Sequence, residues 1–392
     1  MKPNCPSKLK PNREKLGQDS RPASAKATVT TLDSVPVPDP APTPVPASVP
    51  TSAPVPVPAP AQVSVPGPVP ITASVPAPPP APPPAPPFPT FYFERFRFRL
   101  RFRDPLDLPA FPGAVFRGGL GYAFRRTACL HPGEECAACL LAGACPYAYV
   151  FETPHPEGKG TDIPHPFVLE PPPAGAAVAA GEEADLGVVL IGRGTAFLPY
   201  FIYAFEELGG MGLGPRRARF SLETVEDERT GRTVFTGVRR RLREPDRSPE
   251  AAELQREPAP SRAVVLETVT PLRLRQEGEL LARPDFPLLF RAVVRRLRAL
   301  AHFHCGGEPN PAGVERYFEV AGALRAVWEG VGWREQRRYS TRQNSFMQLG
   351  GLTGSLSLEG DLGPVWPFLR LAERVHVGKA SSFGLGRFRL RW

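Results

Sequence analysis

Proline is the residue whose distribution most constrains this chain, because the first 90 residues hold 28 of the 53 prolines. No aromatic residue occurs before Phe88, and from Val35 onward the sequence repeats Val-Pro, Ala-Pro and Pro-Pro. Such a segment cannot bury enough apolar surface to offset the entropy lost on ordering. We therefore predict a disordered, proline-rich tail over residues 1–90. About 300 residues remain, enough for one large domain or two ordinary ones, and we predict two.

Neither a secretory signal nor a membrane span is apparent in the sequence. The basic residues at the N-terminus are not followed by the apolar stretch of a signal peptide. The longest apolar runs, residues 186–192 and 196–205, are far shorter than the roughly 20 residues that a membrane span requires. We expect a soluble, cytoplasmic protein without a membrane partner.

Arginine supplies nearly all the basic charge beyond the tail, since residues 91–392 hold 39 arginines and two lysines, Lys159 and Lys379. In RFRFRLRFR, residues 95–103, arginine alternates with apolar residues. This alternation predicts a strand with one buried face and one face of five arginines. The arginine face is either a solvated surface, which would normally mix charge signs, or a polyanion-binding surface, and we favour binding. The last six residues, RFRLRW, repeat the pattern.

The same order of predicted elements, β-α-β-β-α-β, occurs twice in the chain. This order is typical of an α+β fold with two ferredoxin-like, RRM-like domains in tandem. The first would span residues 91–245 and carry a cysteine-rich insertion, and the second would span residues 263–392. The polar, proline-containing segment 246–262 is interpreted as a linker or long loop. The elements are expected at 95–103, 112–128, 165–169, 186–192, 195–208 and 216–225 in the first domain, and at 263–275, 287–303, 333–342, 351–358, 365–374 and 387–392 in the second.

A glycine-rich loop precedes the last strand of each predicted domain. The loops are GGMGLG at 209–214 and GKASSFGLG at 378–386, and their similarity suggests an internal duplication. Glycine allows backbone N–H groups to approach a phosphate, although each loop could also be a sharp turn that needs positive φ. We predict that both loops bind RNA through Gly212, Gly214, Arg216, Arg217, Gly378, Gly384, Gly386 and Arg387.

Two such units, each with its glycine loop, resemble the RAMP superfamily of CRISPR-associated proteins, and most closely the Cas6 family. The resemblance is densest over residues 338–390 and over LPAFPGAVFRGGLGYAFRRTAC, residues 108–129. It implies an endoribonuclease that cleaves CRISPR precursor transcripts within their repeats, by attack of the 2′-hydroxyl and without a catalytic metal. The implied partners are CRISPR repeat RNA, the mature crRNA and other CRISPR effector subunits. The alternative is a non-catalytic RAMP subunit that binds guide RNA in an effector complex.

The resemblance also implies a catalytic histidine with a neighbouring tyrosine or lysine. Relatives often place that histidine in or just after the first helix, but residues 112–128 contain none. We therefore select His376 and Lys379, three residues further on, as catalytic residues, although His376 could equally alternate inward on a short strand. Tyr339 is the third catalytic candidate, and the neighbouring Arg338 and Arg342 are predicted to bind RNA. No protease triad, Walker loop or acidic metal cluster is evident, which argues against proteases, NTPases and two-metal nucleases.

Four of the six cysteines lie within 17 residues, in the pattern C-x6-C-x2-C-x5-C. Four thiolates at such spacing are typical of a closed, tetrahedral zinc site, and we predict a structural Zn²⁺ held there. An iron–sulphur cluster is the alternative metal centre, and four reduced, packed cysteines are the alternative without metal. The predicted ligands are Cys129, Cys136, Cys139 and Cys145.

Overall fold

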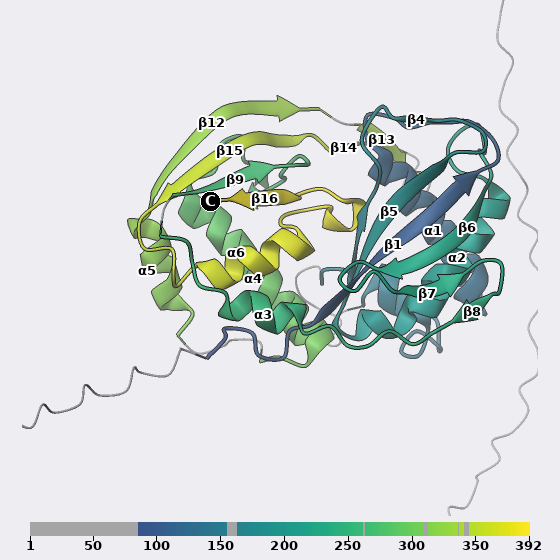
Figure 1. The fold of residues 1–392 in the computed structure, drawn as a ribbon, viewed down its shortest axis with the longest axis horizontal. Helices are drawn as coiled ribbons and strands as arrows, with labels where there is room; N and C mark the ends of the chain where they lie inside the picture. The colour runs from purple at the N-terminus through teal and green to yellow at the C-terminus, as the bar shows by residue number, and fades with distance from the viewer. Residues whose placement is uncertain (1–84, 155–162, 262, 309–312, 336, 341–344) are drawn as a thin grey trace, which may run out of the picture. The chain divides into compact units, whose positions relative to one another are not determined.

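The computed structural model describes residues 85–154, 163–261, 263–308, 313–335, 337–340 and 345–392. These residues build two large antiparallel sheets, each covered by helices on one face, and three sheets of two strands (Figure 1). The expectation of a mixed helix and sheet fold is thereby confirmed. In the part of the chain that the structure describes, no helix has both the length and the apolar composition needed to cross a membrane.

The first sheet has the order β3-β5-β1-β6-β7-β8. Alternate residues of its central strand, from Phe96 to Phe102, are buried against the helices α1 and α2, as the sequence pattern requires. The ring of Phe98, for example, lies 5.0 Å from that of Phe205 on α2. The elements of this half are β1 (Phe93–Phe102), β2 (Leu106–Asp107), α1 (Pro112–Ala128), a π-helix (Ala148–Glu152), β3 (Phe167–Glu170), β4 (Ala177–Val178), β5 (Glu183–Ile191), a 3-10 helix (Gly192–Phe197), α2 (Leu198–Met211), β6 (Phe220–Asp227), β7 (Thr233–Thr236) and β8 (Arg241–Leu242).

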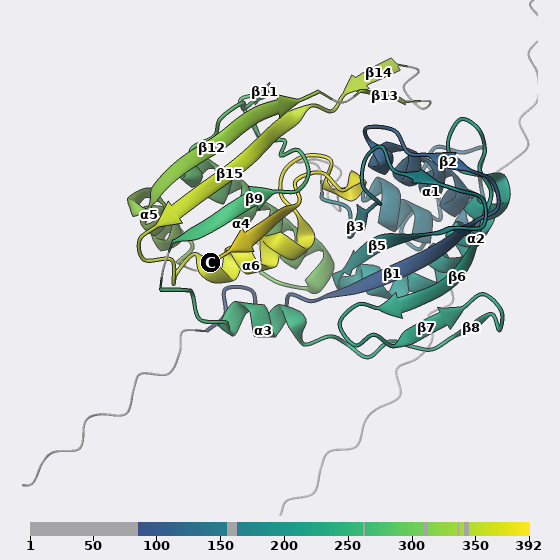
Figure 2. The ribbon, with the colours of Figure 1, turned by 45° about the horizontal axis from the view of Figure 1, so that its top comes forward.

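The second sheet has the order β12-β15-β9-β16, and α4 and α6 supply much of its core. A hairpin of two further strands, β13 and β14, lies at the end of β12 and β15 that faces the first half (Figures 1 and 2). The elements are α3 (Glu250–Arg256), β9 (Val264–Thr268), β10 (Arg275–Gln276), β11 (Glu279–Leu280), α4 (Phe286–Cys305), α5 (Glu315–Ala323), β12 (Arg325–Arg334), β13 (Arg337–Ser340), β14 (Ser345–Gln348), β15 (Gly351–Glu359), α6 (Trp366–Val375), a 3-10 turn (Ser381–Phe383) and β16 (Phe388–Arg391).

Three predicted boundaries differ from the structure. The strand expected at 333–342 is replaced by the longer β12 and the separate β13. The segment 246–262, predicted as a linker or long loop, contains α3, whose Ala251 and Leu254 are buried. Residues 1–84 lie outside the described residues, but Phe88 of the predicted tail is buried, and its N–H donates to Gln255 Oε1 of α3 at 2.8 Å. Phe88 is the first aromatic residue of the chain, and its ring has a large apolar surface whose burial stabilises the fold.

The two halves share one apolar core. Phe93, Val168 and Ile191 of the first sheet are buried in the same cluster as α4 and α6 of the second half. A polar contact adds to this joint, because His304 on α4 lies 2.8 Å from the Tyr149 hydroxyl and 2.8 Å from the Pro164 carbonyl oxygen. A carbonyl only accepts, so His304 Nε2 carries the proton and Nδ1 accepts from Tyr149. Burial, partly opposed by the hydrogen bond to Pro164, lowers the pKa of His304 to about 4, so the ring is neutral.

Acid should weaken this joint through His304. A pKa lowered from 6.5 to about 4 on folding means that the unfolded chain takes up the proton first as the pH falls. The stabilisation is therefore full above pH 6.5 and lost as the pH falls to about 4, by up to about 3 kcal/mol. We measure the free energy of unfolding by urea denaturation at several pH values. As the pH falls over this range, we expect this free energy to decrease more steeply for the wild type than for His304→Gln, which has no ring to titrate. Parallel pH profiles of the two proteins would contradict this expectation.

Candidate functional site

Three segments far apart in the sequence meet at one place, where Phe111, Leu349 and Leu385 form a small buried cluster. Phe111 precedes α1, Leu349 follows the β13–β14 hairpin, and Leu385 lies in the C-terminal glycine loop. The Phe111 ring stacks on Phe383 of that loop at 6.3 Å. The arrangement joins α1 of the first half to the hairpin and the glycine loop of the second, and we call it the loop junction.

The glycines of the C-terminal loop are needed for this packing. A Cβ at Gly384 would lie 2.6 Å from the Leu169 carbonyl oxygen, and one at Gly386 would lie 1.7 Å from that of Val377. Both glycines also have positive φ. Their N–H groups donate to the Ser381 and Pro271 carbonyls, so these two amides are already used within the protein. The structure therefore favours the turn interpretation for Gly384 and Gly386 over direct contact with phosphate.

In the first glycine loop, too, the glycines adopt positive φ and a glycine amide donates within the protein. Gly212 and Gly214 have positive φ, and the Gly212 N–H donates to the Leu208 carbonyl. Gly214 packs near Val115 of α1, so this loop also lies against the first helix. Of its two arginines, Arg216 pairs with Asp107 at 3.0 Å on the surface. Arg217 is exposed.

His376 is placed too deep to contact a substrate in this structure. Its side chain is fully buried, with Nε2 3.0 Å from Glu170 Oε1 and Nδ1 3.3 Å from the Leu385 carbonyl oxygen. Burial lowers the pKa of His376, although its hydrogen bond with Glu170 opposes that shift. The inward-facing alternative therefore describes His376, which links the second half to β3 of the first.

Glu170 completes this buried contact between the halves. Its second oxygen, Oε2, lies 3.0 Å from the Arg387 guanidinium, and the carboxylate is only 8% exposed. Burial raises the pKa of Glu170, but His376 and the charges of Arg387 and Arg95 outweigh burial and lower it to about 2. Arg387, predicted to bind RNA, is thus engaged with a carboxylate. No local sequence signal pairs Glu170 with a histidine 206 residues away.

The other two predicted catalytic residues are Lys379 and Tyr339. Lys379 is exposed, and its N–H donates to the Arg273 carbonyl at 2.9 Å. Arg273 also donates to the Gly350 and Gln348 carbonyls at the base of the hairpin, which connects the Lys379 segment to β14. Tyr339 and Arg338 lie on β13, where Tyr339 pairs with Phe346. Arg342 lies outside the described residues.

Arg117 on α1 is a cation of this site that the sequence analysis did not select. Its guanidinium carbon lies 4.3 Å from the Phe151 ring and 5.4 Å from the rings of Phe167 and Phe383. The side chain is only partly exposed and reaches the glycine loop from α1. Its position in FRGGLG, one turn after the residues that pack on the loop, is the only sequence signal that could have indicated it.

The arginine face of β1 is not a free polyanion-binding surface, contrary to the prediction. Arg97 and Arg99 pair with Asp185 on β5 at 3.8 and 3.2 Å, and Arg101 pairs with Glu183. Arg99 also lies 3.7 Å from Glu226 on β6. Neighbouring strands supply the acidic residues that β1 lacks, so the mixed-charge alternative is the correct one here.

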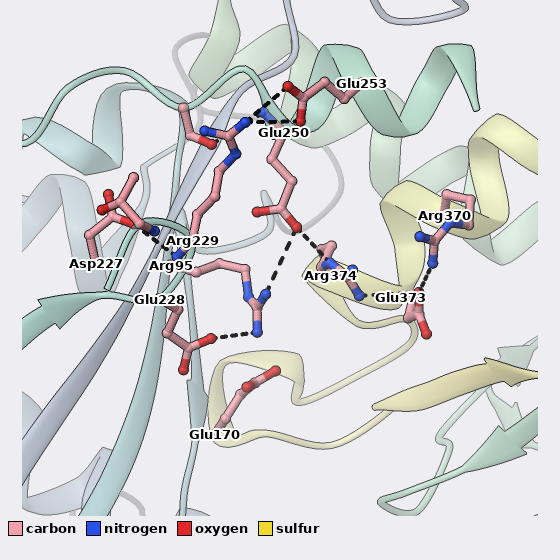
Figure 3. A network of polar contacts seen from close by, with 12 residues as sticks. Arg95, Glu170, Asp227, Glu228, Arg229, Glu250, Glu253, Arg370, Glu373 and Arg374 are labelled. Atoms are coloured by element: carbon pink, nitrogen blue, oxygen red, sulfur yellow. Dashed lines mark hydrogen bonds and ion pairs between the residues drawn. The ribbon is translucent and has the colours of Figure 1, made fainter. Parts of the chain in front are cut away.

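Ion pairs continue from β1 across α3 to α6, as Figure 3 shows. Arg95 lies 2.5 Å from Glu228 and 3.8 Å from Glu250 on α3, and Glu250 accepts from Arg374 on α6 at 2.8 Å. The chain of pairs borders a hollow of about 520 Å³ between the halves. Residues of both signs line this hollow, including Glu170, Glu373, Arg374, Arg387 and Arg389.

The cysteine segment lies beside the end of α1, with Cys136 and Cys145 packed against the first core. Burial and the charges of Glu152, Cys145 and Cys129 raise the pKa of the Cys136 thiol, so these groups are near neighbours. Among the described residues, no group of three or more Cys, His, Asp or Glu is placed to hold a metal ion. The zinc site accordingly stays a prediction from the spacing.

Replacing Glu170 by glutamine should destabilise the protein. The change leaves Arg387 beside a buried neutral amide, and breaking a buried ion pair in this way costs about 3 kcal/mol. The matched control is Glu183→Gln, which removes an exposed partner of Arg101 and should cost less than about 1 kcal/mol. Urea denaturation at neutral pH measures both, and equal losses would show that the Glu170 contact is not special.

Comparison with known proteins finds two family models, each of which matches one half of the folded part of this chain. A family model described as CRISPR-associated endoribonuclease Cas6 matches residues 266–388, and one described as an N-terminal domain matches residues 88–247. An uncharacterized protein of Archaeoglobus fulgidus is 26% identical over 289 residues, which are 72% of this chain and 93% of that protein.

Solved structures agree at the level of the fold. A Cas6 product complex is 17% identical with a TM-score of 0.50, covering 76% of this chain and 100% of that one. Thermus thermophilus Cas6 is 16% identical with a TM-score of 0.46, covering 77% and 99%. The matched segment 266–388 contains the glycine loop and the hairpin of the loop junction. Over residues 266–388, the chain matches the family of CRISPR-associated endoribonucleases Cas6.

Proposed function

We propose that this protein cleaves CRISPR precursor transcripts within their repeats to yield crRNA. One observation carries the proposal: the loop junction joins α1 to the segment that matches the Cas6 model. Two cations from different halves, Arg117 and Lys379, belong to the segments that meet there. The first partner would be repeat RNA. Other CRISPR proteins would also bind, as the solved Cas6-RT-Cas1–Cas2 complex illustrates for a relative. The cytoplasm is the proposed location.

The proposed fold is a pair of ferredoxin-like units. In each half the first strand lies between the third and the fourth, and the second lies beside the third, as in β3-β5-β1-β6 and β12-β15-β9-β16. A helix follows the first strand and another precedes the fourth in both halves. This order supports the β-α-β-β-α-β assignment.

The proposed chemistry is attack of the 2′-hydroxyl on its own 3′-phosphate, without a catalytic metal. Such a reaction needs a base at the 2′-oxygen, an acid at the leaving 5′-oxygen and cations around the phosphate. Lys379 and Arg117 would supply the cations, and Tyr339 on the hairpin would supply a hydroxyl near the reacting oxygens. His376 would act as a positioning residue, since its contact with Glu170 holds the segment that leads to Lys379.

A cleavage assay in EDTA tests both the activity and its independence of metal. Full-length protein is incubated with the repeat RNA of its own locus, and we expect one cut within the repeat that leaves a cyclic phosphate. Binding without a cut would support the non-catalytic subunit instead. A cut that EDTA abolishes and Mg²⁺ restores would contradict the metal-independent mechanism.

Lys379→Arg tests the role of the exposed lysine. A compact ammonium that fits against the phosphate is not replaced by the broader, planar guanidinium. We expect RNA affinity to be retained and single-turnover cleavage to slow at least about tenfold, a loss of about 1.4 kcal/mol of transition-state stabilisation. The reciprocal control, Arg256→Lys at the exposed end of α3, should leave the rate unchanged. If Lys379→Arg cleaves at the wild-type rate, Lys379 has no specific role in the reaction, and Arg117 and Tyr339 become the next catalytic candidates to test.

We also propose a structural zinc held by Cys129, Cys136, Cys139 and Cys145. The support is the spacing and the donor set of four thiols, together with the mutual influence of three of them on the Cys136 thiol. Bound zinc would hold the segment after α1 in a fixed conformation.

Metal analysis of purified protein tests the zinc proposal. We expect about one zinc per chain, and its loss in Cys136→Ser/Cys139→Ser but not in the control Cys305→Ser. Iron with a visible absorption band after anaerobic purification would instead identify an iron–sulphur cluster. Protein that carries neither metal would refute both.

A further inference from the structure

One side of α4 carries a row of basic residues, which we call the α4 stripe. Its members are separated by four, three and four positions and therefore lie on one side of the helix, over about 16 Å of its length. The helix contains no acidic residue, so no carboxylate within α4 offsets this charge. The stripe consists of Arg291, Arg295, Arg298 and His302.

The stripe differs from the arginine face of β1 in its neighbours. On β1, Arg97, Arg99 and Arg101 all pair with carboxylates of adjacent strands. Arg291 and Arg295 are exposed, and neither forms an ion pair within the part of the chain that the structure describes. The guanidinium of Arg291 lies instead 4.8 Å from the ring of Phe318 on α5, which orients it without neutralising it.

Acidic residues do occur near α4, but none forms an ion pair with Arg291 or Arg295 in the part of the chain that the structure describes. Asp285 caps the helix and accepts from the Leu288 N–H at 2.9 Å. Glu315 and Glu319 lie on the neighbouring α5, and no ion pair joins either to Arg291 or Arg295 among the described residues. The charges of Arg291 and Arg295 therefore face solvent.

A general preference for arginine does not account for the stripe, because the arginine on the opposite side of α4 has a defined partner. Arg296 is partly buried and donates to the Val375 and His376 carbonyls at the end of α6. Arg296 is thus bonded within the protein, whereas Arg291 and Arg295 are exposed and form no ion pair among the described residues. Uncompensated guanidinium groups in a line suit the phosphates of a nucleic acid.

We propose that the α4 stripe binds the phosphate backbone of the RNA that this enzyme processes. The proposal rests on the proposed function and extends it by naming a surface outside the loop junction. The stripe runs toward the joint between the halves, where Cys305 at the end of α4 contacts the Tyr92 carbonyl. Contacts to phosphates carry no sequence information, so the stripe would set affinity and salt dependence but not the position of the cut.

The test compares two double variants of equal charge change. Arg291→Gln/Arg295→Gln removes two unpaired charges of the stripe, and Arg97→Gln/Arg101→Gln removes two paired charges of β1. Glutamine has a helix propensity close to that of arginine, so α4 should persist, and circular dichroism at increasing temperature checks this. Fluorescence anisotropy measures binding of labelled repeat RNA at several salt concentrations, and single-turnover cleavage is measured at saturating protein.

For the α4 variant we expect the dissociation constant to rise about tenfold, the slope of log K against log salt to fall by about 1.5, and the saturated cleavage rate to stay unchanged. The β1 variant should change affinity less than about twofold. An α4 variant that binds like the wild type, or equal losses in both variants, would overturn the proposal.

The binding and cleavage readouts separate this inference from the proposed function. Wild-type protein that binds repeat RNA through the stripe but makes no cut would refute the endoribonuclease and retain the stripe. If the wild-type protein cuts the RNA and the α4 variant binds it normally, the endoribonuclease is retained and the role of the stripe is refuted. Wild-type protein without RNA affinity would refute both.

Discussion

A buried carboxylate, Glu170, holds the two halves of the protein together at the place where the candidate site is built. It accepts from His376 and pairs with Arg387, both of which flank the C-terminal glycine loop. Because a buried charge without partners is costly, the loop keeps its position only while these contacts are made. The loop in turn supports Lys379, and its Phe383 and Leu385 pack at the start of α1. The candidate site thus depends on the buried contact of Glu170 with His376 and Arg387, although His376 is too deeply buried to contact a substrate itself.

The same residue type serves opposite purposes according to what the fold places beside it. Arginines on β1 lie opposite carboxylates of β5 and β6, and this balance makes the open face of the sheet a network of ion pairs. Arg296 is partly buried and donates to carbonyls at the end of α6, while Arg291 and Arg295, on another side of the same helix, are exposed. Local charge density along the sequence is therefore a poor guide to where a polyanion binds, since the Coulomb field depends on all neighbours.

Glycine in the two loops allows neighbouring backbone segments to pack closely, because it has no Cβ. The carbonyl oxygens that approach Gly384 and Gly386 leave no room for a Cβ, and the amides of both glycines already donate within the protein. Similar loops at equivalent places, both against α1, suggest that close packing accounts for the repeated glycines. Side-chain cations around the loop junction, rather than glycine amides, are then the groups that would face RNA.

The sequence by itself determined most elements, because each depends on residues a few positions apart: the alternation of β1, the helical spacing of α1, α2, α4 and α6, and the turns at the glycine loops. It also selected Lys379, whose role stays a prediction, and the resemblance indicated the family. Only the tertiary structure decided that His376 is buried against Glu170, that Arg117 reaches the glycine loop, and that the β1 arginines are neutralised. The physical reason is that burial and charge pairing are set by residues brought together from distant parts of the chain, whose identity no local pattern records.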